Sequence, residues 1–211
     1  MAGNASTHEP VIGVLALQGD FDAHRAALER AGARAIPVRT AAQLDDVDGL
    51  ILPGGESTTM LKLLDYENLF EPLRRFGAEK PLFGTCAGAI LLASEVTNPP
   101  QPSLALLDIT VERNGYGRQI DSRIAPIELA QGGTAEAVFI RAPIIRRVGP
   151  QTKVLATYLD APVLVEQGRH LAATFHPELS NGGNQIHNLF VEKVKAQTAH
   201  RPSGGRDRRK Q

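Results

Sequence analysis

The sequence predicts a single-domain α/β protein with a mostly parallel or mixed sheet flanked by helices. Apolar runs of strand length alternate with amphipathic segments of helix length, starting at residue 11. The runs are nearly continuous, as in strands buried on both faces of a parallel sheet, and such alternation is typical of α/β units. With 211 residues, of which 42% are hydrophobic, the chain can bury a sizeable core in one domain.

The first half of the chain supplies alternating strands and helices. Residues 11–17 (VIGVLAL) predict a buried strand, and Asp20 can cap a helix that ends at Gly32. Ser57, after two glycines, can cap a further helix through Leu64. The other elements expected here are strands at 35–38, 49–53 and 81–85 and a helix at 87–95.

The second half of the chain changes to short strands. Residues 98–103 (NPPQPS) cannot sustain a helix or a central strand and are expected to form an exposed loop. A closing helix is expected because Ile186, Phe190 and Val194 fall on one helical face. The strands expected between them are 105–112, 137–141, 154–158, 163–167 and 170–175.

Charge is unevenly placed, although Lys+Arg and Asp+Glu both total 23 and the formal net charge is zero. The sequence after residue 200 (RPSGGRDRRKQ) is basic and has no apolar residue, so it is expected to be disordered, and the rest of the chain is mildly acidic. We therefore expect a flexible N-terminus at 1–10, a single folded domain at 11–197 and a disordered basic tail at 198–211. No nucleic-acid partner is expected, because a solvated tail is not a structured basic face.

A single cysteine, Cys86, excludes an internal disulfide and a thiolate zinc cluster. No apolar run approaches the ~20 residues that span a bilayer, and the start of the chain (MAGNASTHEP) lacks the pattern of a signal peptide. The sequence therefore predicts a cytoplasmic protein without a membrane partner, a metal or a cofactor.

Cys86 stands in Gly84-Thr85-Cys86-Ala87-Gly88, between a predicted strand and a predicted helix. Small residues at this spacing permit the tight strand-to-helix turn, the nucleophile elbow, that projects a nucleophile above the edge of a sheet. The start of a helix also offers backbone N–H groups and a positive dipole end that favour a thiolate. Cys86 is therefore the candidate nucleophile, and a small buried hydrophobe is the alternative interpretation.

A base for this thiol is expected at His176, in the triplet His176-Pro177-Glu178. The proline disfavours a helical conformation for the residue before it, and in extended chain residues two apart face the same side. The imidazole and the Glu178 carboxylate should therefore lie side by side, with one ring nitrogen held by the carboxylate and the other free for the thiol. The alternative is a surface histidine in a turn.

The loop at 53–57 (PGGES) also joins a predicted strand to a predicted helix. Its glycines allow unusual dihedral angles, so the N–H groups of Gly54 and Gly55 can turn toward an oxyanion beside the amide of Ala87. A phosphate cradle is the rival interpretation, but neither GxGxxG nor GxxxxGKS/T is present. The helix that Asp20 caps also carries His24, which could lie near this edge, although a cap and an ordinary histidine are the simpler interpretation.

In combination, these motifs resemble a class I (triad) glutamine amidotransferase domain and, more narrowly, the glutaminase subunits of pyridoxal 5′-phosphate synthase. The resemblance covers about residues 11–194, and GGESTT together with ERNGYGRQ is its specific part, because other triad glutaminases share the elbow but not these blocks. The blocks that carry it are LALQGD at 15–20, LPGGESTTM at 52–60, FGTCAG at 83–88, VERNGYGRQIDS at 111–122, VFIRAP at 138–143 and FHPEL at 175–179.

The resemblance implies a flavodoxin-like amidotransferase fold and hydrolysis of L-glutamine to L-glutamate and ammonia through Cys86, His176 and Glu178. It implies that ammonia passes through a tunnel to a separate synthase subunit in a large hetero-oligomer, for pyridoxal 5′-phosphate (vitamin B6) biosynthesis, and that the glutaminase acts only when docked. The residues implied to hold glutamine are Gly55, Glu56, Ser57, Arg113, Ile140 and Arg141. Independently, an arginine suits the α-carboxylate of glutamine and a carboxylate such as Glu56 suits its α-ammonium group.

Two other functions are also compatible with the sequence. A stand-alone γ-glutamyl hydrolase or peptidase could use the same elbow, although the ERN and FIRAP blocks argue against it. A catalytically silent regulatory interaction subunit on a glutaminase fold is the alternative from another class, and the intact triad weighs against it. Departures from the usual pattern at 98–103, at 181–184 and in the basic tail affect loop shape and partner contacts but not the triad.

Overall fold

The structure, a computed structural model, describes residues 9–114, 122–180 and 184–199. Its first elements are β1 (Val11–Leu15), α1 (Phe21–Arg30), β2 (Arg34–Val38), the 3-10 helix η1 (Ala41–Asp46), β3 (Gly49–Leu52), α2 (Ser57–Tyr66), α3 (Phe70–Glu79), β4 (Leu82–Thr85), α4 (Ala87–Leu92) and β5 (Ala93–Thr97). They are followed by β6 (Leu107–Glu112), β7 (Ser122–Leu129), β8 (Thr134–Ile140), β9 (Ile144–Val148), β10 (Lys153–Tyr158), β11 (Ala161–Gln167), β12 (His170–Ala173), the 3-10 helix η3 (Pro177–Leu179) and α5 (Gln185–Ala199).

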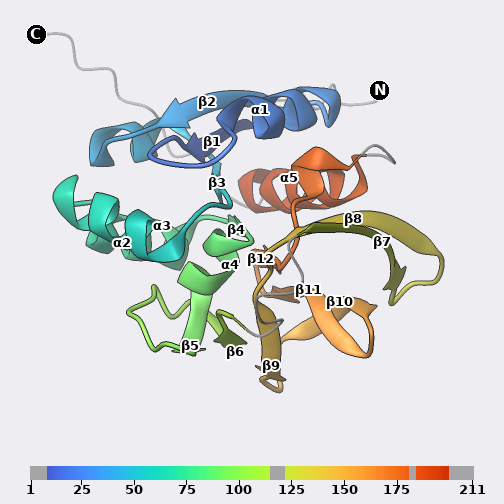
Figure 1. The fold of residues 1–211 in the computed structure, drawn as a ribbon. Helices are drawn as coiled ribbons and strands as arrows, with labels where there is room; N and C mark the ends of the chain where they lie inside the picture. Colours follow the sequence, from blue (N-terminus) through green and yellow to red (C-terminus); the bar gives the residue numbers. More distant parts are fainter. Residues whose placement is uncertain (1–8, 115–121, 181–183, 200–211) are drawn as a thin grey trace, which may run out of the picture.

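A nine-stranded mixed sheet runs through the molecule (Figure 1). Its order is β2-β1-β3-β4-β12-β11-β10-β7-β8, with parallel pairing from β2 to β12 and antiparallel pairing from β12 to β8. A second sheet has the order β5-β6-β9. The predicted α/β architecture with a mixed, mostly parallel central sheet is confirmed.

Helices cover both faces of the parallel part of the sheet. In β3, Leu50 and Leu52 belong to a core shared with α2, α3 and α4, whereas Ile51 belongs to a second core shared with α1 and α5. Figure 1 shows α1 beside α5 and α2 beside α3, and each of these pairs is in contact. Burial on both faces explains why these strands read as unbroken apolar runs.

This topology brings several sequence motifs to one edge of the sheet. Strands β1, β3, β4 and β12 are parallel neighbours, so their carboxyl ends lie together. Gln18 follows β1, the PGGES loop follows β3, Cys86 follows β4 and His176 follows β12. In open α/β sheets the crevice outside the carboxyl ends of the strands is the usual ligand site.

Several expected elements change in detail. Helix α4 stops at Leu92 and not at residue 95, because Ala93 turns to φ −59° and ψ 148° and β5 pairs with β6. The apolar pattern does not predict α3, β7 or β9, whereas the loop at 98–103 is free of helix and strand as expected. Asp20 caps α1 as predicted, because the N–H of Ala23 donates to its Oδ1 at 2.9 Å.

The last helix runs past the expected end of the domain. Helix α5 continues to Ala199, two residues past the predicted domain end at 197. The expectations for residues 1–8 and for the basic tail from residue 200 lie outside the described residues. In the part of the chain that the structure describes, no helix is both long enough and apolar enough to cross a membrane.

Candidate active site

Cys86 lies at a sharp turn between β4 and α4, as the elbow motif predicts. Its backbone has φ 48° and ψ −103°, a combination that residues with a side chain rarely adopt. Two glycines allow the turn: a Cβ on Gly84 would collide with the carbonyl group of Gly88, and a Cβ on Gly88 would collide with that of Leu52. The N–H of Cys86 donates to Ala173 O at 2.8 Å, which ties the turn to β12.

His176 follows β12 and pairs with Glu178 through a turn that the sequence does not predict. Nδ1 of His176 lies 2.8 Å from Oε1 of Glu178. His176 has φ −106° and ψ 85°, but Glu178 lies in the 3-10 helix η3, which begins at Pro177. Proline suits the first position of a helix because its missing N–H would have no partner there. The side-by-side arrangement is therefore present, whereas the extended geometry predicted for it is wrong.

Burial and hydrogen bonding place opposite charges on this pair. Burial lowers the pKa of His176, but hydrogen bonds with Cys86 and Glu178 outweigh it and raise this pKa to about 10. Burial raises the pKa of Glu178, but the hydrogen bond from His176 and the positive charge of that ring outweigh it, so this pKa is lowered. At neutral pH the pair is an imidazolium and a carboxylate.

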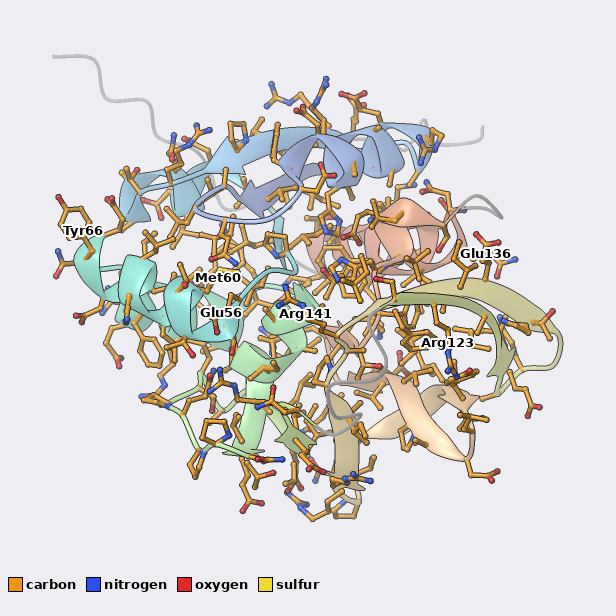
Figure 2. The ribbon with its side chains drawn as sticks, in the orientation of Figure 1. Glu56, Met60, Tyr66, Arg123, Glu136 and Arg141 are labelled. Carbon is orange, nitrogen blue, oxygen red and sulfur yellow. The ribbon has the colours of Figure 1, made fainter. Side chains whose placement is uncertain are left out.

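A cavity of about 400 Å³ has Cys86 and His176 in its wall. All the residues implied to hold glutamine line the same cavity, namely Gly55, Glu56, Ser57, Arg113, Ile140 and Arg141. Figure 2 labels two of them near the middle of the view, Glu56 just before α2 and Arg141 just after β8. Within the described ranges, no group of three or more His, Cys, Asp or Glu side chains is placed to hold a metal ion.

Glu56 caps α2, which corrects the expectation that Ser57 would do so. Its carboxylate accepts hydrogen bonds from the backbone N–H groups of Thr58 and Thr59 at 2.9 and 2.7 Å. Burial raises the pKa of Glu56, but these hydrogen bonds outweigh it and lower the pKa to about 2. Arg113 donates to Thr58 Oγ1 at 2.7 Å and lies 3.4 Å from Glu56, so a fixed anion and a fixed cation border the cavity.

The three backbone positions predicted to form an oxyanion hole lie close to Cys86 or His176 or in the wall of their cavity. Ala87 directly follows Cys86 as the first residue of α4. Gly54 lies so close to the ring of His176 that a Cβ at this position would collide with the ring. Gly55, with φ 142°, has a backbone conformation that favours glycine.

Ile140 and Arg141 form another part of the cavity wall, at the end of β8. Sγ of Cys86 lies 3.9 Å from the carbonyl oxygen of Ile140, so this strand end contacts the candidate nucleophile. Arg141 has φ 43° and an exposed side chain, which adds a second guanidinium to the border of the cavity.

Three residues of the cavity wall, Gln18, Ile90 and Asn114, are absent from the sequence-based set. Gln18 comes just after β1, and its place after a parallel strand is a signal that could have identified it. Ile90 reads as an ordinary helix residue. Asn114 adjoins Arg113 in the ERNGYGRQ block, and its place in that block is a signal that could have identified it.

Comparison with known proteins agrees with this geometry. A protein-family model described as the SNO glutamine amidotransferase family matches residues 14–196. The chain belongs to this family. Membership confirms the resemblance drawn from the motifs, the amidotransferase fold and the expected glutamine amidotransferase activity.

Individual relatives align with most of this chain. Pyridoxal 5′-phosphate synthase subunit PdxT of Solibacter usitatus is 60% identical over 190 residues, covering 87% of this chain and 98% of the relative. The protein of the same name from Koribacter versatilis is 57% identical over 185 residues, covering 87% and 95%. A crystal structure described as a glutamine amidotransferase has a TM-score of 0.81 and 47% identity, covering 87% of this chain and 98% of that one.

Proposed function

We propose that this amidotransferase is the glutaminase subunit of a pyridoxal 5′-phosphate synthase, and that Cys86, His176 and Glu178 are its catalytic triad. Family membership supports the reaction class, and the names of the relatives support the assembly. The observation that carries the proposal is that Cys86 and His176 share the wall of one cavity while Nδ1 of His176 lies 2.8 Å from Oε1 of Glu178.

The first chemical step forms a thioester. Sγ of Cys86, as a thiolate, bonds to the side-chain amide carbon of glutamine, and the carbonyl electron pair moves onto oxygen. When the carbonyl re-forms, the carbon–nitrogen bond breaks and His176 gives its proton to the departing nitrogen, which leaves as ammonia. Glu178 stabilises the imidazolium before this transfer and keeps Nδ1 protonated.

The second step regenerates the enzyme. His176, now neutral, accepts a proton from water while the water oxygen bonds to the thioester carbon. The carbon–sulfur bond then breaks, which releases glutamate and returns Cys86 to the thiolate beside a protonated ring. In both steps the amides of Gly54, Gly55 and Ala87 donate to the oxyanion, and one well-placed donor contributes about 3 kcal/mol to lowering the barrier.

Charge complementarity positions the substrate. Glutamine carries an α-carboxylate, which Arg113 or Arg141 can bind, and an α-ammonium group, which suits the ionised Glu56. A carboxylate oxygen can accept more than one hydrogen bond, so capping α2 leaves Glu56 able to bind the substrate. Gly55, Ser57 and Ile140 complete the proposed binding site.

The ammonia is used on another subunit. The sequence contains neither the GxGxxG nor the GxxxxGKS/T phosphate-binding motif. This fits synthesis of the phosphorylated product on a partner. The proposed assembly is a hetero-oligomer in which ammonia passes through a tunnel to the synthase subunit and in which docking switches the glutaminase on.

Glutamate release tests this function. The wild-type chain mixed with its synthase subunit should release glutamate from glutamine, whereas Cys86→Ala in the same mixture should release none above the buffer rate. Size-exclusion chromatography should show that both chains bind the synthase subunit equally. Equal rates for the two chains would overturn the assignment of Cys86, and no release by the wild-type mixture would overturn the function.

A further inference from the structure

A buried pair of histidines lies behind the triad. His24 on α1 and His187 on α5 are 0% and 1% exposed, and Nδ1 of His24 lies 3.1 Å from Nε2 of His187. The other ring nitrogen of His24, Nε2, lies 3.5 Å from Oε2 of Glu178 and 3.4 Å from Oγ1 of Thr85. Thr85 directly precedes Cys86. His24 therefore contacts both the orienting carboxylate and the residue before the nucleophile.

Half of the Glu178 carboxylate lacks a good hydrogen bond. Oε1 is held by His176, but Oε2 is buried and has no hydrogen bond of good geometry among the described residues. The ring nitrogen facing it is Nε2 of His24, at 3.5 Å, which is longer than the usual ~2.9 Å. Hydrogen bonds of catalytic groups are often long without substrate and tighten in the complex. His24 is thus the donor poised for the second carboxylate oxygen.

Of the two arrangements of the ring protons, one gives Oε2 of Glu178 a donor. In the other, the Thr85 hydroxyl donates to Nε2 of His24 and Oε2 stays without a hydrogen bond from the described residues. Burial lowers the pKa of both rings, that of His187 to about 3, so each ring is neutral and carries one N–H. A proton on Nδ1 of His24 would leave the lone pair of Nε2 facing a carboxylate oxygen, and two acceptors repel. Nε2 therefore carries the proton, and Nδ1 accepts from Nε2–H of His187.

The charges around His24 favour this arrangement. The titratable groups that act on it are Glu178, His176 and Asp20, together with the neutral ring of His187 that touches it. A second cation beside the imidazolium of His176 would be unfavourable in a buried site, whereas a neutral donor leaves one positive and one negative charge there.

We propose that His24 is a positioning residue for glutamine hydrolysis: its neutral imidazole donates from Nε2 to the second carboxylate oxygen of Glu178 and fixes the plane in which that carboxylate holds His176. The inference rests on the triad of the proposed function and adds a residue to it. His187 holds His24 in turn, so helices α1 and α5 both determine the direction of the His176 ring.

Replacements of His24 in the complete chain, assembled with the synthase subunit, test the proposal. His24→Gln keeps an N–H near the place of Nε2, whereas His24→Leu fills the space without a donor. His24→Asn, a second polar variant, is too short to reach Glu178. We expect His24→Leu and His24→Asn to lower kcat about ten- to hundredfold with little change in KM, and His24→Gln to recover most of the loss.

A different buried histidine provides the control. His170 is also buried, but its Nδ1 accepts from Leu82 N at 3.3 Å and it takes no part in the triad. His170→Leu should lower the unfolding temperature while leaving kcat unchanged. If loss of kcat merely followed loss of stability, His170→Leu and His24→Leu would behave alike, and the positioning role would be overturned.

Nitrogen-15 NMR of the histidine rings reports on the hydrogen bond between His176 and Glu178 without any glutamine hydrolysis. The proton on Nδ1 of His176 should be protected and shifted downfield in the wild type and in His24→Gln, and should exchange faster in His24→Leu and His24→Asn. An unchanged His176 resonance in folded His24→Asn overturns the proposal. A wild-type complex that releases no glutamate overturns the proposed function instead, and the NMR comparison still decides the role of His24.

Discussion

Nδ1 of His176 lies 2.8 Å from Oε1 of Glu178, and the two residues are separated in the chain by one proline. The contact is made within a 3-10 turn, while the N–H of His176 donates to Val138 O at 2.8 Å and anchors the turn to β8. The proposed orienting carboxylate therefore comes from the same short turn as the proposed base. A local turn sets their distance, and the surrounding sheet sets where the ring points.

Glu178→Gln should separate charge from shape at this contact. The amide keeps the size of the side chain but cannot stabilise the imidazolium, so the pKa of His176 falls from its raised value and the rate falls at least about a hundredfold. The His176 ring then loses its proton at a lower pH, so the alkaline limb of the pH–rate profile moves to lower pH. Glu166→Gln removes a carboxylate that pairs with Lys193 at 2.6 Å outside the site, and should change neither quantity.

Gly88→Ala should disrupt the elbow. A Cβ on Gly88 collides with the carbonyl group of Leu52, so the expected loss of unfolding free energy is about 3 kcal/mol, measured by denaturant titration. Gly32→Ala is the control: it has open space and costs about 1 kcal/mol, because only its positive φ of 76° is strained. Equal losses for the two variants would show that the close approach in the elbow carries no special strain.

Glu56→Ala should affect both the fold and the substrate. Loss of the cap on α2 should cost about 1 kcal/mol of unfolding free energy, and loss of the negative charge should raise KM for glutamine about tenfold. Glu71→Ala removes an exposed carboxylate on α3 that pairs with Arg74, and should change stability by less than about 0.5 kcal/mol with no effect on KM. A normal KM in Glu56→Ala would remove Glu56 from the glutamine site.

His187→Phe should change how stability depends on pH. Burial lowers the pKa of His187 from its ordinary value of 6.5 to about 3, so between these values the unfolded chain binds a proton that the folded chain does not. The stability gained from the neutral ring is present above pH 6.5 and is lost as the pH falls toward 3. Denaturant titrations in this window should give the variant a slope smaller by about 1.4 kcal/mol per pH unit; an identical slope would mean that His187 is charged in the fold.

Much of the fold follows from apolar patterning. The strands that became β1, β3 and β4 are unbroken apolar runs because both faces are covered. The sequence pattern does not predict helix α3, because Pro72 and Gly77 are weak helix formers. Pro72 lies in the first turn, where its missing N–H costs little, and Gly77 lies where a Cβ would collide with Leu106.

The remaining differences come from pairing with distant segments. Residues 93–95 continue a helix-like pattern, yet they form β5 because β6 offers a parallel partner whose position local sequence does not reveal. Strand β7, paired with β8, buries only Ala125 and Ile127, and the proline between them argues against a strand when the sequence is read alone.

The candidate site residues could be predicted better than the residues that contact them, because a reactive functional group can be identified from the residue type alone. Cys86, His176 and Glu178 carry distinctive functional groups, and the parallel strands bring two of them to one edge. His24 reads as an ordinary helix histidine in sequence, and its contact with Glu178 depends on how α1 packs. The sequence does not single out Gln18, because an amide side chain after a strand can have many roles. The assembled structure places it in the cavity wall.

Covalent labelling by an electrophilic glutamine analogue shows whether Cys86 is the nucleophile that attacks glutamine. The assembled wild-type complex is treated with a diazoketone analogue, and the digested chain is analysed by mass spectrometry. We expect one adduct, on Cys86, which forms more slowly when glutamine is present and is absent in Cys86→Ala. Labelling of a different residue, or full glutamate release by Cys86→Ala, would contradict it.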